Sequence, residues 1–358
     1  MAQRSFDTAS WTDTPGLCRV DGRAVMKNLL EQVATTIADY RAGDLSALDA
    51  DDVGRWVAQF DEEERKPLLE ELLHVWKQIY VSRSDAERFL TKEINNKALA
   101  GSDPKAFLEG TEFLKIQERG QSQADMLKLL KPILKAETGL RLSACGGDGR
   151  FIYIDDVLFT GGRIKSDLST WLTNEAPAAS TVYVLVMAVH AFGEWRLEED
   201  LKAKAQELGK KLDLKIFRLL SLENRKFKKD SADVLWPTTL PPTAAMYAAG
   251  ATGHASRNPG GTSSLFSSEA GRHNLEQAFL RAGLRIRAFS QNPKPVLRPL
   301  GYGPFGVGFG SLFVSWRNCP NNAPLALWWG DPERPKWHPF SKWRPLVPRK
   351  TYGGDDDL

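Results

Sequence analysis

The sequence predicts an α/β protein with a helical N-terminal domain, a central parallel sheet and a C-terminal cover. Apolar residues recur at three-to-four spacing before about residue 105, which is typical of helices packed on a core. Strand and helix patterns alternate between residues 106 and 292, as in a parallel sheet joined by helices. From residue 293 the chain is rich in Pro, Gly and Trp. We therefore expect three domains, 1–105, 106–292 and 293–358, the last ending in an acidic tail.

The helical domain is predicted from two segments. The first, 23–43, ends in a glycine suited to a helix stop. The second, 51–82, carries large apolar side chains at helical spacing. We expect these side chains to form a core: Trp56, Phe60, Leu68, Leu72 and Trp76.

The central domain is predicted from alternating elements. A short strand, a polar loop and a helix are expected over 109–139, and a strand over 150–156. Further along, the elements expected are a helix at 163–174, a strand at 181–190, a helix at 196–212 and a strand at 214–222. The strand TVYVLVMAVH is apolar almost throughout, as in a strand covered on both faces. A loop or lid is expected at 237–265, a helix at 267–283 and a short strand at 284–289.

Composition indicates a globular protein, with 42% hydrophobic and 26% charged residues. No run of 18 or more apolar residues exists, and the N-terminal residues lack the apolar centre of a signal peptide. We therefore expect a cytoplasmic protein without a membrane partner. The net charge of +3 neither requires nor excludes nucleic acid.

The stretch YIDDVLFTGG, 153–162, has two incompatible interpretations. Its first four letters match the Tyr-x-Asp-Asp motif of a reverse-transcriptase palm, in which two carboxylates hold catalytic metal. Such a site needs a third carboxylate on an upstream strand, and the upstream segment here has a helical pattern. The polymerase interpretation also leaves Thr160, Gly161 and Gly162 unexplained.

The second interpretation, a sugar-phosphate loop, uses every letter. An apolar strand delivers Asp155 and Asp156 to the carboxyl end of a parallel sheet, where α/β folds bind ligands. The following TGGR turn opens a helix, whose backbone N–H groups and positive end suit a phosphate. The two carboxylates can accept hydrogen bonds from ribose hydroxyls. A ribose 5-phosphate group is the ligand that this pattern indicates, while a plain strand-to-helix turn with solvated aspartates is the alternative.

The stretch FIYIDDVLFTGGR resembles the 13-residue signature of the type I phosphoribosyltransferases, which bind 5-phosphoribosyl 1-pyrophosphate (PRPP) with Mg²⁺. Tyr153 and Phe159 differ from the residues usual there, and a phenyl ring inside the loop can narrow the site. The resemblance implies that Asp155 and Asp156 hold the ribose hydroxyls. It implies that the 5-phosphate is held by Thr160, Gly161, Gly162 and Arg163. Mg²⁺ would arrive with the pyrophosphate rather than sit in a protein cage.

A pyrophosphate loop is also implied, and ERGQSQ is the best candidate. There Gly120 precedes Ser122 and Gln123 at a helix start. An ordinary helix with Ser122 as its cap is the alternative. The family places a catalytic loop before the PRPP strand, and only residues 136–149 remain for it here. So short a loop argues against phosphoribosyl transfer of the nucleotide-salvage type.

Residues 50–348 also resemble the phosphoribosyltransferase-like proteins of bacterial conflict and antiphage gene clusters. The motifs are RWVAQF, GQSQADML, IDDVLFTGG, RHNLEQAFLRAG, RPLG and PNNAPLALWW. This resemblance implies a defence effector that binds PRPP or a nucleotide, with an ATPase or a reverse transcriptase encoded nearby. An inactive nucleotide or PRPP sensor, or a protein-interaction module, is the alternative.

Three further sets have both functional and structural interpretations. The basic stretch 225–229 around Phe227 can bind nucleic acid or form a solvated strand end. The segment with Trp337 and Trp343 can likewise bind nucleic acid, or its tryptophans can pack on the helical domain. His190, at a strand end, is a pocket candidate. Asn321 and Asn322 suit either a pocket or a turn.

Overall fold

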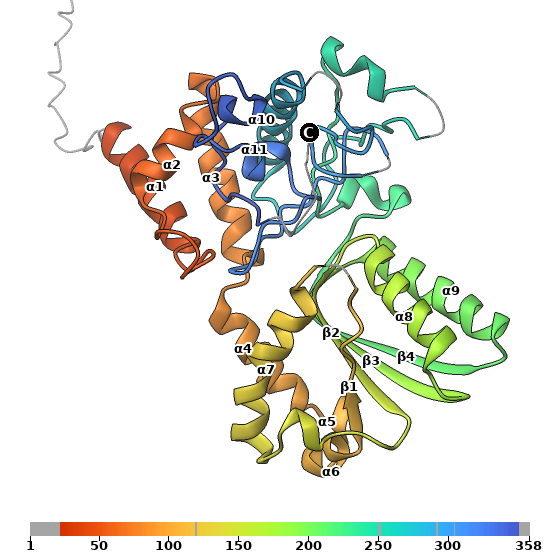
Figure 1. The fold of residues 1–358 in the computed structure, drawn as a ribbon. Helices are drawn as coiled ribbons and strands as arrows, with labels where there is room; N and C mark the ends of the chain where they lie inside the picture. The colour runs from red at the N-terminus through yellow and green to blue at the C-terminus, as the bar shows by residue number, and fades with distance from the viewer. Residues whose placement is uncertain (1–21, 119, 250–251, 291–292, 304, 351–358) are drawn as a thin grey trace, which may run out of the picture.

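The computed structural model describes residues 22–118, 120–249, 252–290, 293–303 and 305–350 (Figure 1). Its centre is a four-stranded sheet in the order β1-β2-β3-β4. The strands are β1 (Thr111–Phe113), β2 (Arg150–Leu158), β3 (Ala179–His190) and β4 (Lys211–Leu222), and each neighbouring pair is parallel. The predicted α/β class with a parallel sheet is confirmed.

Three helices connect the strands and cover the sheet. α7 (Ser122–Thr138) packs on β2 and on α4 (Arg83–Ile94), whereas α8 (Gly162–Asn174) and α9 (Ala191–Glu207) lie together on the opposite face (Figure 1). β3 is therefore covered on both faces, and every residue from Val182 to His190 is buried. This explains its continuous apolar sequence.

The helical N-terminal region is also confirmed. It comprises α1 (Gly22–Thr36), α2 (Ala50–Val57), α3 (Glu62–Ile79) and α4, followed by the short α5 (Lys97–Ala100) and α6 (Pro104–Glu109). After the sheet come α10 (Glu269–Arg287) and α11 (Leu325–Trp328). Four 3-10 turns complete the described elements, at Leu142–Ala144, Lys226–Ser231, Pro242–Tyr247 and Pro339–Lys342. No helix in the described ranges is long and apolar enough to cross a bilayer.

The elements form two lobes (Figure 1). The sheet lobe, residues 83–222, holds the sheet with α4 to α9; the helical lobe, 22–81 and 232–350, holds α1 to α3 with α10 and α11. In the helical lobe, α10 packs on α3 although nearly 200 residues separate them. The expected divisions at residues 105 and 292 remain predictions about folding units, which limited proteolysis would test.

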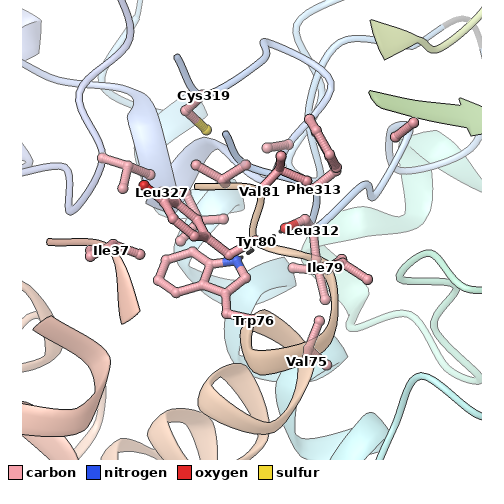
Figure 2. Packing of buried hydrophobic residues seen from close by; sticks show 14 of the residues in the cluster. Ile37, Val75, Trp76, Ile79, Tyr80, Val81, Leu312, Phe313, Cys319 and Leu327 are labelled. Atoms are coloured by element: carbon pink, nitrogen blue, oxygen red, sulfur yellow. Dashed lines mark hydrogen bonds between the residues drawn. The ribbon is translucent and has the colours of Figure 1, made fainter. Parts of the chain in front are cut away.

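Buried tryptophans join the C-terminal segment to the N-terminal helices, and Figure 2 shows one of them, Trp76, near Leu312. The indole N–H of Trp76 donates to the carbonyl of Leu312 at 3.0 Å, and that of Trp56 donates to Ala326 at 2.8 Å. The backbone N–H of Val81 donates to Val314 at 3.1 Å. Trp56, Phe60, Leu68, Leu72 and Trp76 are all buried, as expected. The C-terminal cover is thus held by the residues predicted as core.

Two expected boundaries are wrong. Residues 284–289 do not form a strand, because α10 continues to Arg287 and buries Ala282 and Ile286 on one helical face. A methyl group on Gly283 would lie 2.3 Å from the carbonyl of Pro299, so the helix backbone packs directly on the C-terminal segment. α9 begins at Ala191 and ends at Glu207, and β4 begins at Lys211, within the stretch expected to be helix.

Candidate functional site

A cavity of about 1210 Å³ lies where the carboxyl end of β2 faces the C-terminal segment. Its lining on the sheet side comes from two stretches, 120–122 and 155–164, together with Glu118. Its lining on the other side comes from the helical lobe: Val296, Tyr302, Gly303, Phe313, Ser315, Arg317, Asn318, Pro320, Asn321, Asn322, Arg349 and Lys350. The cavity therefore lies at the strand end where open α/β sheets bind ligands.

Asp155 and Asp156 both line this cavity. Asp155 is only 2% exposed, and its Oδ1 accepts the N–H of Asp156 at 2.9 Å. Burial, reinforced by the charge of Asp156, raises the pKa of Asp155 to about 7. The Asp156 Oδ1 accepts the N–H of Val157 at 2.8 Å. Asp155 therefore keeps its proton to a higher pH than an ordinary aspartate does.

The TGGR turn forms the floor beside the two aspartates. Gly161 has φ +75° and stands at the N-cap of α8, where no side chain makes a capping hydrogen bond. A β-carbon on Gly161 would lie 2.8 Å from the carbonyl of Gly193, so both backbone conformation and space require glycine. The Thr160 hydroxyl accepts the N–H of Gly162 at 3.4 Å. The positive N-terminal end of α8, a helix of 13 residues, thus opens onto the cavity.

The predicted pyrophosphate loop lies next to this turn. Gly120 has φ +90°, and a β-carbon there would lie 2.4 Å from the Arg163 guanidinium. Gly120, Ser122 and Arg163 line the cavity together. Ser122 is the first residue of α7 rather than its cap, and its hydroxyl lowers the pKa of Asp155, against the larger effect of burial. The chain thus brings both predicted loops to one cavity.

Gln123 differs from its neighbours because it does not line the cavity. It is buried, and its Oε1 accepts the backbone N–H groups of Ile116 and Gln117 at 2.8 and 3.0 Å. Its side chain therefore shapes the segment before α7.

Arg317, which the sequence did not single out, lies against the signature. Its Nη2 is 3.3 Å from the Oδ2 of Asp156, and its Nε is 3.8 Å from the Oδ2 of Asp125 on α7. The Arg317 side chain is only 10% exposed. Tyr302, Ser315, Asn318, Arg349 and Lys350 also line the cavity without having been predicted, whereas Asn321 and Asn322 were candidates and do line it.

Phe159 faces the C-terminal segment. Its ring stacks on His190 with centroids 4.9 Å apart and makes an edge contact with Phe309 at 5.7 Å. His190 does not line the cavity; it is fully buried, its Nε2 lies 3.1 Å from the Ser311 Oγ, and burial lowers its pKa to about 3. Phe159 lines the cavity as well, so it forms one wall and also joins the two lobes.

Tyr153, the other unusual residue of the signature, packs with apolar side chains of α8. Its hydroxyl donates to the Asp167 Oδ2 at 2.8 Å, and both groups are buried. Because Asp167 belongs to α8, this hydrogen bond fastens the phosphate-loop helix to the strand that carries the aspartates.

The other candidate sets lie outside the cavity lining. In the basic stretch, Arg225 pairs with Glu223 and lies over the ring of Phe227, which is 75% exposed. Trp343 is buried and packs edge-on against Phe60, as the structural interpretation expected, while Trp337 is 78% exposed.

The described residues contain no cluster of three His, Cys, Asp or Glu side chains that could hold a metal ion. The carboxylates at the cavity are Glu118, Asp155 and Asp156. Carboxylate and phosphate oxygens are the ligands that Mg²⁺ prefers, usually with several waters kept. The donor set fits an ion that enters with a phosphorylated ligand.

Comparisons with known proteins identify the family of the chain. The family model PRTase-CE, in which PRTase abbreviates phosphoribosyltransferase, matches residues 53–349. Among solved structures, the chain is similar to orotate phosphoribosyltransferase from Aeropyrum pernix, with 18% identity and a TM-score of 0.22, over 38% of this chain and 69% of that chain. No curated protein matches the chain. The family match covers most of the chain, so this phosphoribosyltransferase-like protein belongs to the PRTase-CE family.

Proposed function

We propose that the cavity binds PRPP, or a nucleotide that contains ribose 5-phosphate, and that the protein transfers the phosphoribosyl group. The observation that carries the proposal is that Asp155, Asp156 and the turn 160–163 face one cavity at the N-terminus of α8. An anion at a helix start gains from the backbone N–H groups and from the helix dipole. Neighbouring carboxylates can accept hydrogen bonds from two ribose hydroxyls.

In the proposed reaction, a lone pair on the acceptor attacks C1 of the ribose. The bond from C1 to the pyrophosphate oxygen breaks, and its electron pair leaves with pyrophosphate. The acceptor then loses its proton to solvent. The protein contributes position and charge, through the 5-phosphate turn and two cations that line the cavity, Arg163 and Arg317. Mg²⁺ bound to the pyrophosphate would offset charge on the leaving group.

The test is calorimetric titration of Mg²⁺–PRPP into the wild type and an Asp155→Asn, Asp156→Asn double variant. Both substitutions keep side-chain shape and remove charge. Micromolar binding that is lost in the double variant supports the proposal. A matched control is Asp213→Asn, an exposed carboxylate on β4 outside the cavity lining. Equal binding by wild type and double variant would refute the assigned roles.

Binding without turnover is the second candidate. The observation that favours it is the contact of Phe159 with His190 and Phe309, which links the phosphate loop to the helical lobe. Ligand binding at the turn would then alter the contacts between the lobes, as in a sensor. Pyrophosphate release separates the two candidates, because a sensor binds PRPP and releases none with any acceptor.

We further propose that the protein acts in bacterial antiphage defence, together with an ATPase or a reverse transcriptase encoded nearby. The resemblance of its motifs to conflict-associated proteins supports this role. Phage-plating efficiency on cells that express the gene cluster with wild-type or Asp155→Asn, Asp156→Asn protein is the test. Equal plating on both strains would refute a role that depends on the pocket.

A further inference from the structure

The cavity has more room than one ribose-phosphate ligand needs. Sites for small molecules usually have volumes of about 300–1000 Å³. The cavity here has about 1210 Å³. A ligand at the turn 160–163 with its ribose at Asp155 and Asp156 uses the sheet side, so the wall from the helical lobe is left for another group.

This second wall is basic. Its described lining residues include Arg317, Arg349 and Lys350, whereas the carboxylates among the described lining residues, Glu118, Asp155 and Asp156, belong to the sheet side. The charges thus separate across the cavity. Cations gathered in a partly enclosed space attract anions more strongly than the same cations dispersed on a surface.

Specific hydrogen bonds hold these cations together. The Asn318 Nδ2 donates to the carbonyl of Lys350 at 3.1 Å, and the N–H of Lys350 donates to the Asn318 Oδ1 at 2.8 Å. This pairing joins two segments that lie 32 residues apart, and Arg317, Arg349 and Lys350 from these segments line the same cavity. The Arg349 guanidinium lies over the Trp328 ring at 5.8 Å, which further fixes the segment.

The ion pair of Lys350 is of a kind that an incoming anion can replace. Lys350 Nζ lies 2.5 Å from the Oδ2 of Asp44, whose side chain is 45% exposed. An exposed ion pair contributes little stability, so exchanging the carboxylate for a phosphate costs little. Asn321 and Tyr302 line the same wall and can contact a base by hydrogen bonding and stacking.

We propose that Arg349 and Lys350 form a second anion subsite, which takes the terminal phosphate of a nucleotide or of a nucleic-acid end. This inference deepens the proposed function, because the ligand here would be the acceptor for the group bound at the turn. It makes the acceptor a phosphate-bearing compound, because a neutral base or nucleoside carries no phosphate for Arg349 and Lys350 to bind.

The test compares phosphate-bearing probes with their unphosphorylated forms by calorimetry. The probes are AMP, GMP, CMP and UMP beside their nucleosides, and a thymidine tetranucleotide with and without a 5′-phosphate. Each is titrated into protein saturated with Mg²⁺–PRPP, so that the ribose-phosphate turn is already filled. We expect at least one phosphorylated probe to bind about tenfold more tightly than its unphosphorylated form. The mononucleotide and tetranucleotide arms identify which source supplies the phosphate.

Variants then locate the binding. Arg349→Gln and Lys350→Gln should each lower the affinity for the phosphorylated probe about tenfold and leave the affinity for PRPP unchanged. Lys336→Gln is the matched control, since it removes one exposed lysine charge outside the lining. Equal loss in the control, no loss in the two variants, or no preference for phosphorylated probes would overturn the subsite.

The outcome for PRPP itself separates the two proposals. If PRPP does not bind to the wild type, the proposed function fails, and the probes are titrated without it. A phosphorylated probe that then loses affinity in Arg349→Gln but not in Asp156→Asn still supports the second subsite. A probe that loses affinity only in Asp156→Asn occupies the sheet side and refutes it.

Discussion

The Arg317 guanidinium lies 3.3 Å from the Asp156 carboxylate and so brings a cation from the helical lobe onto the phosphoribosyl signature of the sheet lobe. Its charge also lowers the pKa of Asp155, although burial and Asp156 raise that pKa more. Two adjacent carboxylates thus share one arginine that lies over 160 residues away in the sequence. The properties of the signature therefore depend on the C-terminal segment.

The first prediction concerns pH. The carboxylate of Asp155 is the form that accepts hydrogen bonds from ribose, and its pKa is about 7, so affinity for PRPP should rise as pH increases from 6 to 8. In Arg317→Gln, the loss of the cation should move the midpoint to higher pH by up to about one unit. Arg317→Lys keeps the charge and should move it less. Calorimetry at several pH values measures the midpoints, and an unchanged midpoint in Arg317→Gln would contradict the coupling.

A second prediction concerns stability. The pKa of Asp155 is about 7 in the folded protein, against an ordinary value of 3.8. The folded protein therefore holds a proton that the unfolded chain releases, and the free energy of unfolding falls as pH rises from about 4 to 7. Asp155→Asn removes the ionisation. It should be more stable than wild type above pH 7, by a few kcal/mol at most, with the gap closing towards pH 4. Urea unfolding at pH 4, 6 and 8 checks this, and a constant gap would contradict it.

A third prediction tests the turn. Gly161→Ala places a methyl group near the carbonyl of Gly193 in a left-handed conformation. We expect a loss of about 1–3 kcal/mol in stability and of PRPP binding. Gly209→Ala is the matched control, because Gly209 has φ +65° with no atom within 4 Å of the added methyl. Thermal unfolding and calorimetry measure both effects. Equal losses in the two variants would mean that the contact with Gly193 does not contribute to the effect of Gly161→Ala.

The sequence predicted the parallel sheet and the residues on the sheet side of the cavity because those features depend on local pattern. A strand, two acids and a glycine turn are consecutive, so their meeting at one strand end follows from the fold class. Gly120, in the stretch predicted as a pyrophosphate loop, also lines the cavity, and its role stays a prediction. Gln123 was assigned to the ligand because spacing does not show that its side chain turns back to Ile116 and Gln117.

Most residues of the opposite wall were not predicted, because no motif or periodic pattern in the sequence identifies them. Arg317, Arg349 and Lys350 lie in a segment without periodicity, and their positions depend on long-range hydrogen bonds such as those of Trp76 and Asn318. Helix α10 extended past its expected end for a similar reason. Residues 284–287, in which Leu and Ile alternate with Arg, fit a strand locally, but packing on α3 and on Pro299 favours helix.

The last prediction concerns the hydrogen bond between Tyr153 and Asp167, which joins β2 to α8. Tyr153→Phe removes the hydroxyl and leaves a buried carboxyl group without that donor, so we expect a loss of about 1–3 kcal/mol in stability. Because α8 carries the phosphate turn at its start, PRPP affinity should also fall, while the pH midpoint of binding stays the same. Asp167→Asn alone and with Tyr153→Phe completes a double-mutant cycle by urea unfolding. A coupling energy near zero would show that the two groups act independently, and the unusual tyrosine of the signature would then serve only to fill the core.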